Sequence, residues 1–198
     1  QLDGSLTDTG SGAATNGTPT AVGAPTYATP GATGSGQAIA LNGTSQYINL
    51  GNPTNLQITG QITLSAWIKP AAFPSASGQM NIINKGHNLT PSGEITLRLD
   101  SATNLTVGAW NGTNYVTSAA NVVQLNQWQH VCGLYDGTAW RLYRNGVQVS
   151  SATSAQGAVS VAGATAANNV WSIGSRGGAA ERLFNGQIDD VRIYNRGL

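Results

Sequence analysis

The sequence predicts an all-β fold, and two observations carry this prediction. First, alternating strand patterns stand on both sides of Asp136-Gly137 and on both sides of Asn145-Gly146. Each dipeptide tolerates positive φ, so each marks a tight hairpin turn. Second, no window of roughly 11 residues or more has apolar residues at the i, i+3, i+4, i+7 spacing of an amphipathic helix. We therefore expect antiparallel strands and almost no helix.

The strands can be placed in order along the chain. Residues 8–36 are rich in Gly, Ala, Thr and Pro, which predicts a loop with one irregular edge strand near 22–27. Beyond residue 36 the alternation becomes regular. Residues 153–169 are small and are expected to form a loop. The other strands are expected at 37–41, 45–50, 61–69, 80–85, 94–99, 104–110, 114–118, 127–135, 139–144, 147–151, 170–174 and 187–194.

The last of these strands contains an irregularity. Val191 and Ile193 alternate properly, whereas Ile188 is out of phase by one residue. A β-bulge at Asp189-Asp190 would return Ile188 to the core face, because a bulge inserts one extra residue into a strand. The interior itself is expected to include Trp67, Trp128, Ile68, Val131, Leu142 and Ile193.

Length and composition limit the possible functions. A chain of 198 residues fits one domain spanning 1–198, and at that size roughly 70% of the unfolded surface can be buried. A net charge of +1 and a charged content of 9% argue against nucleic acid or an anionic membrane as a partner. The single cysteine, Cys132, excludes an internal disulfide and is expected to be a small buried thiol.

The balance of polar residues favours a location outside the cell. Thr, Ser, Asn, Gly and Ala are abundant where Lys and Glu usually keep a cytosolic protein soluble. There is no signal-peptide pattern and no apolar run of about 20 residues that would suit a membrane-spanning helix. The chain is expected to be secreted or exposed on a cell or virion surface.

Six blocks, in order and spacing, resemble the laminin G-like, concanavalin A-like domains. They are LDGSLTD (2–8), GQAIALNGTSQYINLG (36–51), ITLSAWIKP (62–70), QWQHVCGLYDG (127–137), RLYRNGV (141–147) and FNGQIDDVRIYNRGL (184–198). The resemblance implies a two-sheet antiparallel jelly-roll sandwich, and most members of this family are binding or adhesion modules without catalysis. Such a domain is expected to be part of, or excised from, a larger surface or secreted assembly.

The resemblance also implies a calcium site. Bacterial relatives often hold a calcium ion near the N-terminal Asp-Gly and the C-terminal acidic pair, which correspond here to Asp3 with Asp189 and Asp190. Paired carboxylates supply the oxygen ligands that calcium prefers. The alternative is that one Asp of the pair forms an ion pair with a nearby arginine and that the other is solvated. The double calcium site of pentraxins is not expected, because the corresponding loop, 175–182, has one carboxylate between two arginines.

Aromatic residues near hairpin ends are the candidate ligand platform, since sugar rings stack their C–H faces on such side chains. Trp110 precedes the Asn111-Gly112 turn and Trp140 follows the Asp136-Gly137 turn. If these rings are exposed, glycan binding is favoured, and if they are packed in the core, a structural role is favoured. The full set of candidates is Trp110, Tyr115, Trp140 and Trp171, with Asn111, Asn114 and Arg141 as hydrogen-bonding partners.

Catalytic patterns are missing from the sequence. Laminarinase-type hydrolases share the expected fold and carry carboxylates at alternate positions of one strand. Here Glu94 stands alone in its strand and Glu181 lies in a loop. The sequence also has no G-x-S-x-G elbow, no phosphate-binding glycine loop and no His/Cys cluster. Two functions remain: a non-catalytic carbohydrate-binding or adhesion module, or a structural domain that acts through protein-protein contacts.

Overall fold

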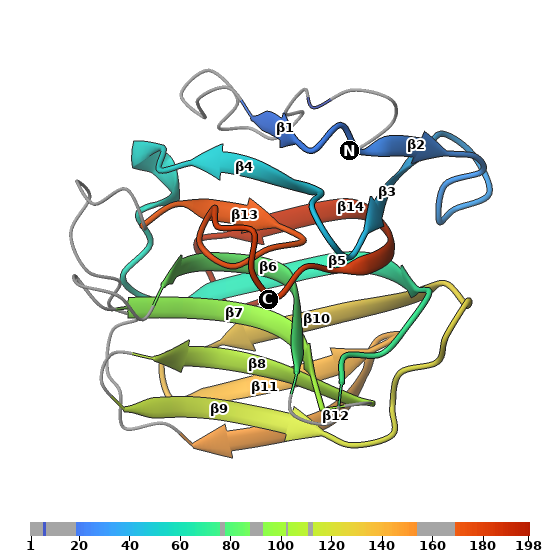
Figure 1. Ribbon diagram of the computed structural model, residues 1–198. Coiled ribbons are helices and arrows are strands. Elements are labelled where there is room, and N and C mark those ends of the chain that lie inside the picture. The colour runs from blue at the N-terminus through green and yellow to red at the C-terminus, as the bar shows by residue number, and fades with distance from the viewer. Residues whose placement is uncertain are drawn as a thin grey trace.

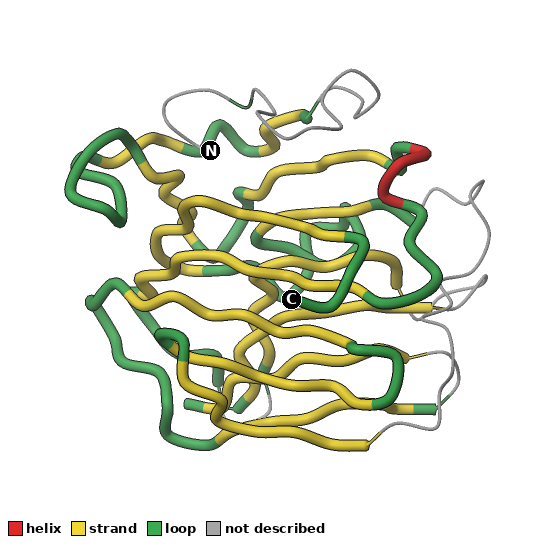
Figure 2. The backbone as a smooth tube through the Cα atoms, turned by 180° about the vertical axis from the view of Figure 1, so that it is seen from behind, coloured by secondary structure: helices red, strands yellow, loops and turns green. Residues whose placement is uncertain are grey.

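Two antiparallel seven-stranded sheets pack face to face in the structure of the chain, a computed structural model (Figure 1). The structure describes residues 6, 19–75, 78–87, 93–101, 103–110, 113–153 and 169–198, without the side chains of Asn114 and Tyr115. Within these ranges the only helix is one 3-10 turn, Thr54–Leu56, and the remaining regular structure is strand (Figure 2). The predicted all-β jelly-roll sandwich is therefore confirmed.

Each sheet combines strands that are distant in the sequence. In order across sheet A the strands are β1 (Thr20–Val22), β4 (Tyr47–Gly51), β13 (Trp171–Ile173), β6 (Gln79–His87), β7 (Gly93–Asp100), β8 (Asn104–Trp110) and β9 (Asn114–Ala119). In order across sheet B they are β12 (Val147–Thr153), β11 (Ala139–Arg144), β10 (Gln129–Tyr135), β5 (Ile62–Pro70), β14 (Asn185–Tyr194), β3 (Ala38–Asn42) and β2 (Thr26–Ala28).

Beyond residue 36 the strand bounds agree with the predicted ones to within a few residues, and both predicted hairpins of sheet B are present. The prediction of one edge strand near 22–27 is wrong: Gly23 and Ala24 take positive φ and separate two short strands, β1 and β2, which belong to different sheets. Asn145 and Gly146 both have positive φ (48° and 78°), as the tight turn between β11 and β12 requires. The turn between β10 and β11 comprises residues 136–138, as the predicted strand bounds imply, and among these only Gly137 takes positive φ (97°).

The core lies between the sheets and is formed mainly by the apolar side chains at alternate positions of the strands. In β5, every second residue from Ile62 to Ile68 is fully buried. Burying one such aliphatic side chain stabilises the fold by roughly 1.5–3 kcal/mol. The sheets approach each other closely at Gly133 of β10, where a Cβ atom would collide with Val107 of β8.

Three of the expected core residues are less buried than predicted. Ile68, Val131 and Leu142 are fully buried, but Trp67 and Trp128 are only half-buried, and Ile193 packs against the core only in part. Trp67 alternates with the core residues of β5, so its ring lies on the outward face, edge-on to His130 with ring centroids 5.5 Å apart. Cys132 lies on the same outward face and is half-buried, not buried as expected.

The predicted bulge in β14 is confirmed. The register with β5 shifts between Asp189 and Arg192, and Asp190 takes a φ of 44°. Ile188 consequently reaches the core and is fully buried.

The loop after β13, residues 174–182, extends sheet A alongside β6. It continues along β6 beyond the end of β13, since the Gly174 N–H donates to the Ile82 carbonyl and the Asn81 N–H donates to the Arg182 carbonyl. Gly174 has a φ of 78°, and a Cβ there would collide with Leu41. The two backbone hydrogen bonds to β6 hold the ends of segment 174–182 beside the sheet.

A candidate binding pocket on sheet A

Strand β7 presents polar residues to the outside of the sandwich. Glu94, Thr96, Arg98 and Asp100 alternate with three buried aliphatic residues, so all four lie on one face of the strand. On the neighbouring strand β8, Trp110 pairs with Glu94 and Gly108 pairs with Thr96. Gly108 contributes no side chain to this face.

Three of the four polar residues of β7, together with Trp110, line a pocket of about 230 Å³. Its wall combines β7 and β8 with the loop after β13, and its main lining residues are Glu94, Thr96, Arg98, Trp110, Arg176 and Arg182. The pocket therefore brings one tryptophan and three arginines together around a single carboxylate.

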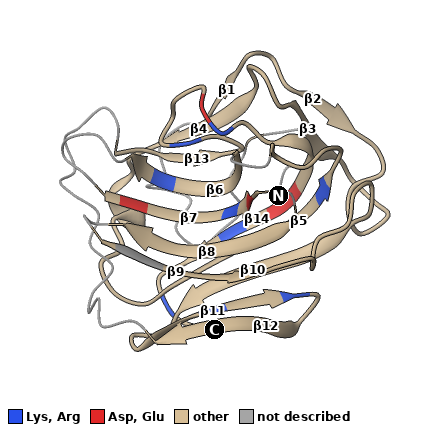
Figure 3. Ribbon diagram, turned by 60° about the horizontal axis from the view of Figure 1, so that its bottom comes forward, with Lys and Arg blue, Asp and Glu red and all other residues tan. Residues whose placement is uncertain are grey.

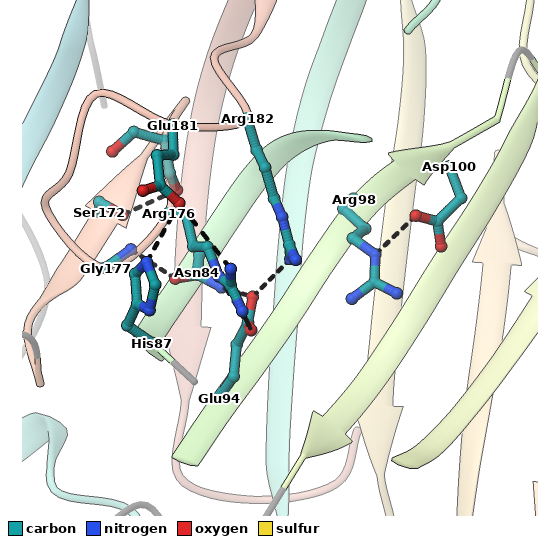
Figure 4. Close-up of polar contacts among 11 residues, drawn as sticks. Asn84, His87, Glu94, Arg98, Asp100, Ser172, Arg176, Gly177, Glu181 and Arg182 are labelled. Carbon is teal, nitrogen blue, oxygen red and sulfur yellow. Dashed lines mark hydrogen bonds and ion pairs between the residues drawn. The ribbon is translucent and has the colours of Figure 1, made fainter. Parts of the chain in front are cut away.

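Glu94 is the centre of the polar network (Figure 4). Its Oε2 accepts hydrogen bonds from Arg176 Nη2 (2.7 Å) and Nε (3.1 Å). Its Oε1 accepts from Asn84 Nδ2 (2.9 Å) and Arg182 Nη1 (3.1 Å). The carboxylate is 5% exposed and accepts four hydrogen bonds, so its charge is compensated by two guanidinium groups.

Asn84 ties this network to the backbone of the loop. It donates to Glu94 through Nδ2 and accepts from the Gly177 N–H through Oδ1 at 2.7 Å. The Ser172 hydroxyl donates to the Ser175 carbonyl at 2.9 Å, which adds a second tie between β13 and the loop. The two loop arginines are thus held in place by hydrogen bonds that reach back to β6, β7 and β13.

Further charged residues surround the network. Arg98 Nε donates to Asp100 Oδ1 at 2.8 Å, and His87 Nε2 lies 3.1 Å from Glu181 Oε2. Burial lowers the pKa of Arg182, and the nearby charges of Arg176 and Arg98 lower it further, while those of Glu94 and Asp100 raise it. Two other arginines and two carboxylates therefore lie close enough to Arg182 for their charges to change its pKa.

Two buried polar groups near the pocket have no hydrogen-bond partner within the described residues. They are the Thr96 hydroxyl and the side-chain amide of Asn81, which lies across from Arg98 at the bulge in β6. Most buried polar groups in proteins are satisfied, so unsatisfied ones mark places where a fold accepts a cost.

Of the predicted ligand residues, the structure brings Trp110 to this pocket. Asn114 pairs with Trp110 and Tyr115 with Ala109 through the backbone of β9, but their side chains lie outside the described part of the structure. Asn111 lies wholly outside the described residues. The assignment of these three to a ligand remains a prediction.

The expectation that Trp140 and Trp171 could offer exposed rings is wrong. Both are fully buried. Trp140 packs against Tyr135 with ring centroids 5.3 Å apart, and Trp171 donates its Nε1 hydrogen to the Leu56 carbonyl at 2.9 Å. Arg141 does not approach Trp110 either, because it belongs to sheet B, where its Nε donates to Asp136 at 2.7 Å.

The predicted metal ligands lie in a different region, at the β14 bulge. Asp189 is buried, and its carboxylate accepts hydrogen bonds from the Ala32 N–H (2.8 Å) and the Asp190 N–H (2.7 Å). Asp190 forms an ion pair with Arg192 at 2.9 Å, as in the alternative to a metal site, but Asp189 is buried and not solvated as that alternative expected. Asp3 lies outside the described residues, among which no group of three acidic, histidine or cysteine side chains could hold a metal ion.

The pocket's arginines were not predicted from the sequence. The alternation of Glu94, Thr96, Arg98 and Asp100 with aliphatic residues was a usable signal for one polar strand face. No comparable signal marks Arg176 and Arg182, because their partner Glu94 is 82 and 88 residues away.

Charged residues are sparse over the rest of the molecule (Figure 3). Three of the nine basic residues of the chain line this one pocket. None of the helical structure in the described ranges has the length or apolar character needed to cross a membrane.

Several solved structures resemble this fold. Domain 4 of AbnA, a GH43 extracellular arabinanase from Geobacillus stearothermophilus, in complex with arabinotriose, is 24% identical, with a TM-score of 0.54 over 87% of this chain and 75% of that one. The CBM40 of the Ruminococcus gnavus IT-sialidase, bound to α2,6 sialyllactose, is 15% identical, with a TM-score of 0.60 over 73% and 81%. The enzymatically active domain of tailspike protein 2 from bacteriophage CBA120 is 19% identical, with a TM-score of 0.61 over 90% of this chain and 29% of that one.

A search of curated proteins found no match. A family model does match, and it covers residues 42–198, which is most of the chain. It agrees with the sequence blocks and with the two-sheet architecture. The chain belongs to this Laminin_G_3 family of the concanavalin A-like lectin/glucanases superfamily.

Proposed function

We propose that the protein is a non-catalytic carbohydrate-binding module whose ligand site is the pocket on sheet A. The observation that carries this proposal is that Trp110 and the polar face of β7 line one pocket. An aromatic ring beside a few fixed polar groups suits a sugar, which has apolar C–H faces and a rim of hydroxyls. The pocket is smaller than the roughly 300–1,000 Å³ of typical small-molecule sites, so it would seat about one sugar residue.

The solved relatives support the same proposal at the level of function. The arabinanase domain holds arabinotriose and the sialidase module holds sialyllactose. Those ligands belong to those proteins, but both show the shared fold in contact with oligosaccharide. A module of this kind would meet its glycan outside the cell, as an adhesive part of a secreted or surface protein.

The state of Glu94 supports a role without bond cleavage. Glycoside hydrolysis generally uses two carboxyl groups that can exchange protons or attack the sugar. Both oxygens of Glu94 already accept two hydrogen bonds each. Asp100 is engaged by Arg98. Neither carboxylate is placed as a free acid, base or nucleophile.

The second candidate is a structural domain that acts through protein-protein contacts. It is favoured by the burial of Trp140 and Trp171, which takes two of the three candidate tryptophans away from ligands. Trp110 is only half-buried and lines the pocket, so it distinguishes the two functions.

Replacing Trp110 tests the proposal. We expect the wild type to bind its glycan with a Kd on the order of 10 µM to 1 mM, equivalent to a binding free energy of roughly −4 to −7 kcal/mol. On a glycan array, Trp110→Ala should weaken this binding at least tenfold, because the stacking surface is removed. Trp67→Ala is the matched control, since Trp67 is also half-buried but lies on the outward face of sheet B. Unchanged binding in a folded Trp110→Ala variant, or release of sugar from any polysaccharide by the wild type, contradicts the proposal.

A further inference from the structure

The pocket's hydrogen-bond donors are unevenly used. Arg176 directs its Nε and Nη2 to Glu94 and has Glu181 3.8 Å from its Nη1. By contrast, Arg98 uses only Nε, toward Asp100, and Arg182 uses only Nη1, toward Glu94. Within the described part of the protein, both terminal nitrogens of Arg98 and the Nε and Nη2 of Arg182 have no protein acceptor.

These spare donors belong to side chains that line the same pocket as Trp110. Figure 4 shows Arg182 extending from the loop toward Glu94, with Arg98 on the adjacent part of β7. Arg98 is 14% exposed and Arg182 is 25% exposed, so a ligand in the pocket could reach both without displacing a covering element.

The charged residues that line the pocket also favour an anion, since three of them are arginines. Among the described residues, Glu94 is the only carboxylate that lines the pocket, and its four hydrogen bonds occupy it fully. The pKa of Arg182 is lowered mainly by burial; the charges of Glu94 and Asp100 raise it, and those of Arg176 and Arg98 lower it, because both guanidinium groups repel that of Arg182. An anion between Arg98 and Arg182 would reduce this repulsion.

We propose that the pocket recognises sugars that carry a carboxylate, with Arg98 and Arg182 binding the carboxylate beside Trp110. This inference rests on the proposed function and adds the ligand class to it. A guanidinium presents a planar fork of donors that matches a carboxylate in two parallel hydrogen bonds. A neutral sugar could stack on Trp110 but would leave the spare arginine donors without a charged partner.

The test is a glycan array that compares each acidic sugar with its own neutral form. Oligosaccharides ending in glucuronic, galacturonic or sialic acid are printed beside the same compounds with the carboxyl group reduced to an alcohol, and beside sulfated neutral oligosaccharides. We expect the wild type to bind carboxylated forms at least tenfold more tightly than reduced ones. Equal binding to carboxylated and reduced forms, or preference for the sulfated neutral set, overturns the carboxylate assignment while leaving glycan binding intact.

Variants locate the effect. Arg98→Gln and Arg98→Lys should each weaken binding of the carboxylated form at least tenfold. The Lys variant keeps the positive charge, but binding weakens because the planar fork of donors is lost. Arg192→Gln, an exposed arginine on sheet B that also pairs with an aspartate, is the matched control. Melting temperature confirms folding, and Arg98 has only one protein partner to lose. Unchanged preference in both Arg98 variants overturns the inference, and no binding to any glycan by the wild type defeats the proposed function as well.

Discussion

Lys85 is a cation on the core-facing side of β6. It pairs through the backbone with Ile95 and Trp171, both fully buried, and is itself 3% exposed. Its Nζ lies 5.8 Å from the centre of the Trp171 ring, a cation–π contact that offsets part of the desolvation. Burial lowers the pKa of Lys85 to about 8.

This residue should destabilise the fold at neutral pH. The unfolded lysine holds its proton up to about pH 10.4, whereas the folded one releases it near pH 8, so stability rises with pH between these values. We expect Lys85→Met to raise the free energy of unfolding at pH 7 by about 1–3 kcal/mol. The gain should shrink by pH 10. Urea unfolding at both pH values measures this, with Lys69→Met on the outward face of β5 as control. A variant less stable than the wild type at pH 7 contradicts it.

The hairpin of β10 and β11 depends on one carboxylate. Asp136 Oδ1 accepts hydrogen bonds of 2.8 Å from the N–H and hydroxyl of Thr138 and from the Ala139 N–H, and Oδ2 accepts from Arg141. Burial alone would raise the pKa of Asp136, but these hydrogen bonds outweigh it and hold the pKa well below its ordinary value. The turn is therefore organised by a side chain as well as by Gly137.

We expect Asp136→Asn to lower the free energy of unfolding at pH 7 by about 1–3 kcal/mol, because charge-assisted hydrogen bonds are lost. The contribution of Asp136 is fully present above the unfolded pKa of about 3.9 and is lost as the pH falls toward the folded pKa. The difference between wild type and variant should therefore narrow below pH 4 in chemical unfolding. Asp100→Asn, which loses a single ion pair, should cost less. A constant difference from pH 7 to pH 2 contradicts this account.

Calcium would act on the molecule as a whole, because it would tie the N-terminal segment to β14. Asp189 and Asp190 are adjacent at the bulge, and each carboxylate keeps lone pairs beyond the hydrogen bonds it accepts. Two carboxylates are too few for the six to eight oxygens that calcium prefers, so the predicted site depends on Asp3.

If Asp3, Asp189 and Asp190 bind calcium, removing the ion should lower the melting temperature, since a ligand that binds only the native state stabilises it by mass action. Thermal unfolding with excess chelator and with added calcium measures the shift. In the Asp3→Asn variant the calcium-dependent shift should be lost. Equal melting temperatures with chelator and with calcium would reject the site.

The strands and several local features could be predicted from the sequence because their causes are local. Alternation placed β5, β7 and β8, the Asn145-Gly146 pair placed a turn, and the phase error at Ile188 placed a bulge. These depend on side-chain direction and φ preference over a few residues.

Which face of each strand meets the other sheet was harder to predict from the sequence. Trp67 was expected in the core because an indole is usual in the matching block of the resembling family, but its neighbours Ala66 and Ile68 occupy the core-facing positions. Trp140 and Trp171 were considered for a ligand, but packing of both sheets buries them. Burial is a property of the assembled sandwich.

The sequence by itself thus determined the fold class, the positions of most strands along the chain and the low overall charge of this protein. Only the tertiary structure decided that Arg176 and Arg182 meet Glu94, because residues 82 and 88 positions apart become neighbours when the loop after β13 lies along β6. It also decided that Trp110 joins them in one pocket while the other two candidate tryptophans do not. Secondary structure follows from short-range preferences, whereas a binding site is made by contacts between distant segments, and no local pattern encodes their distances.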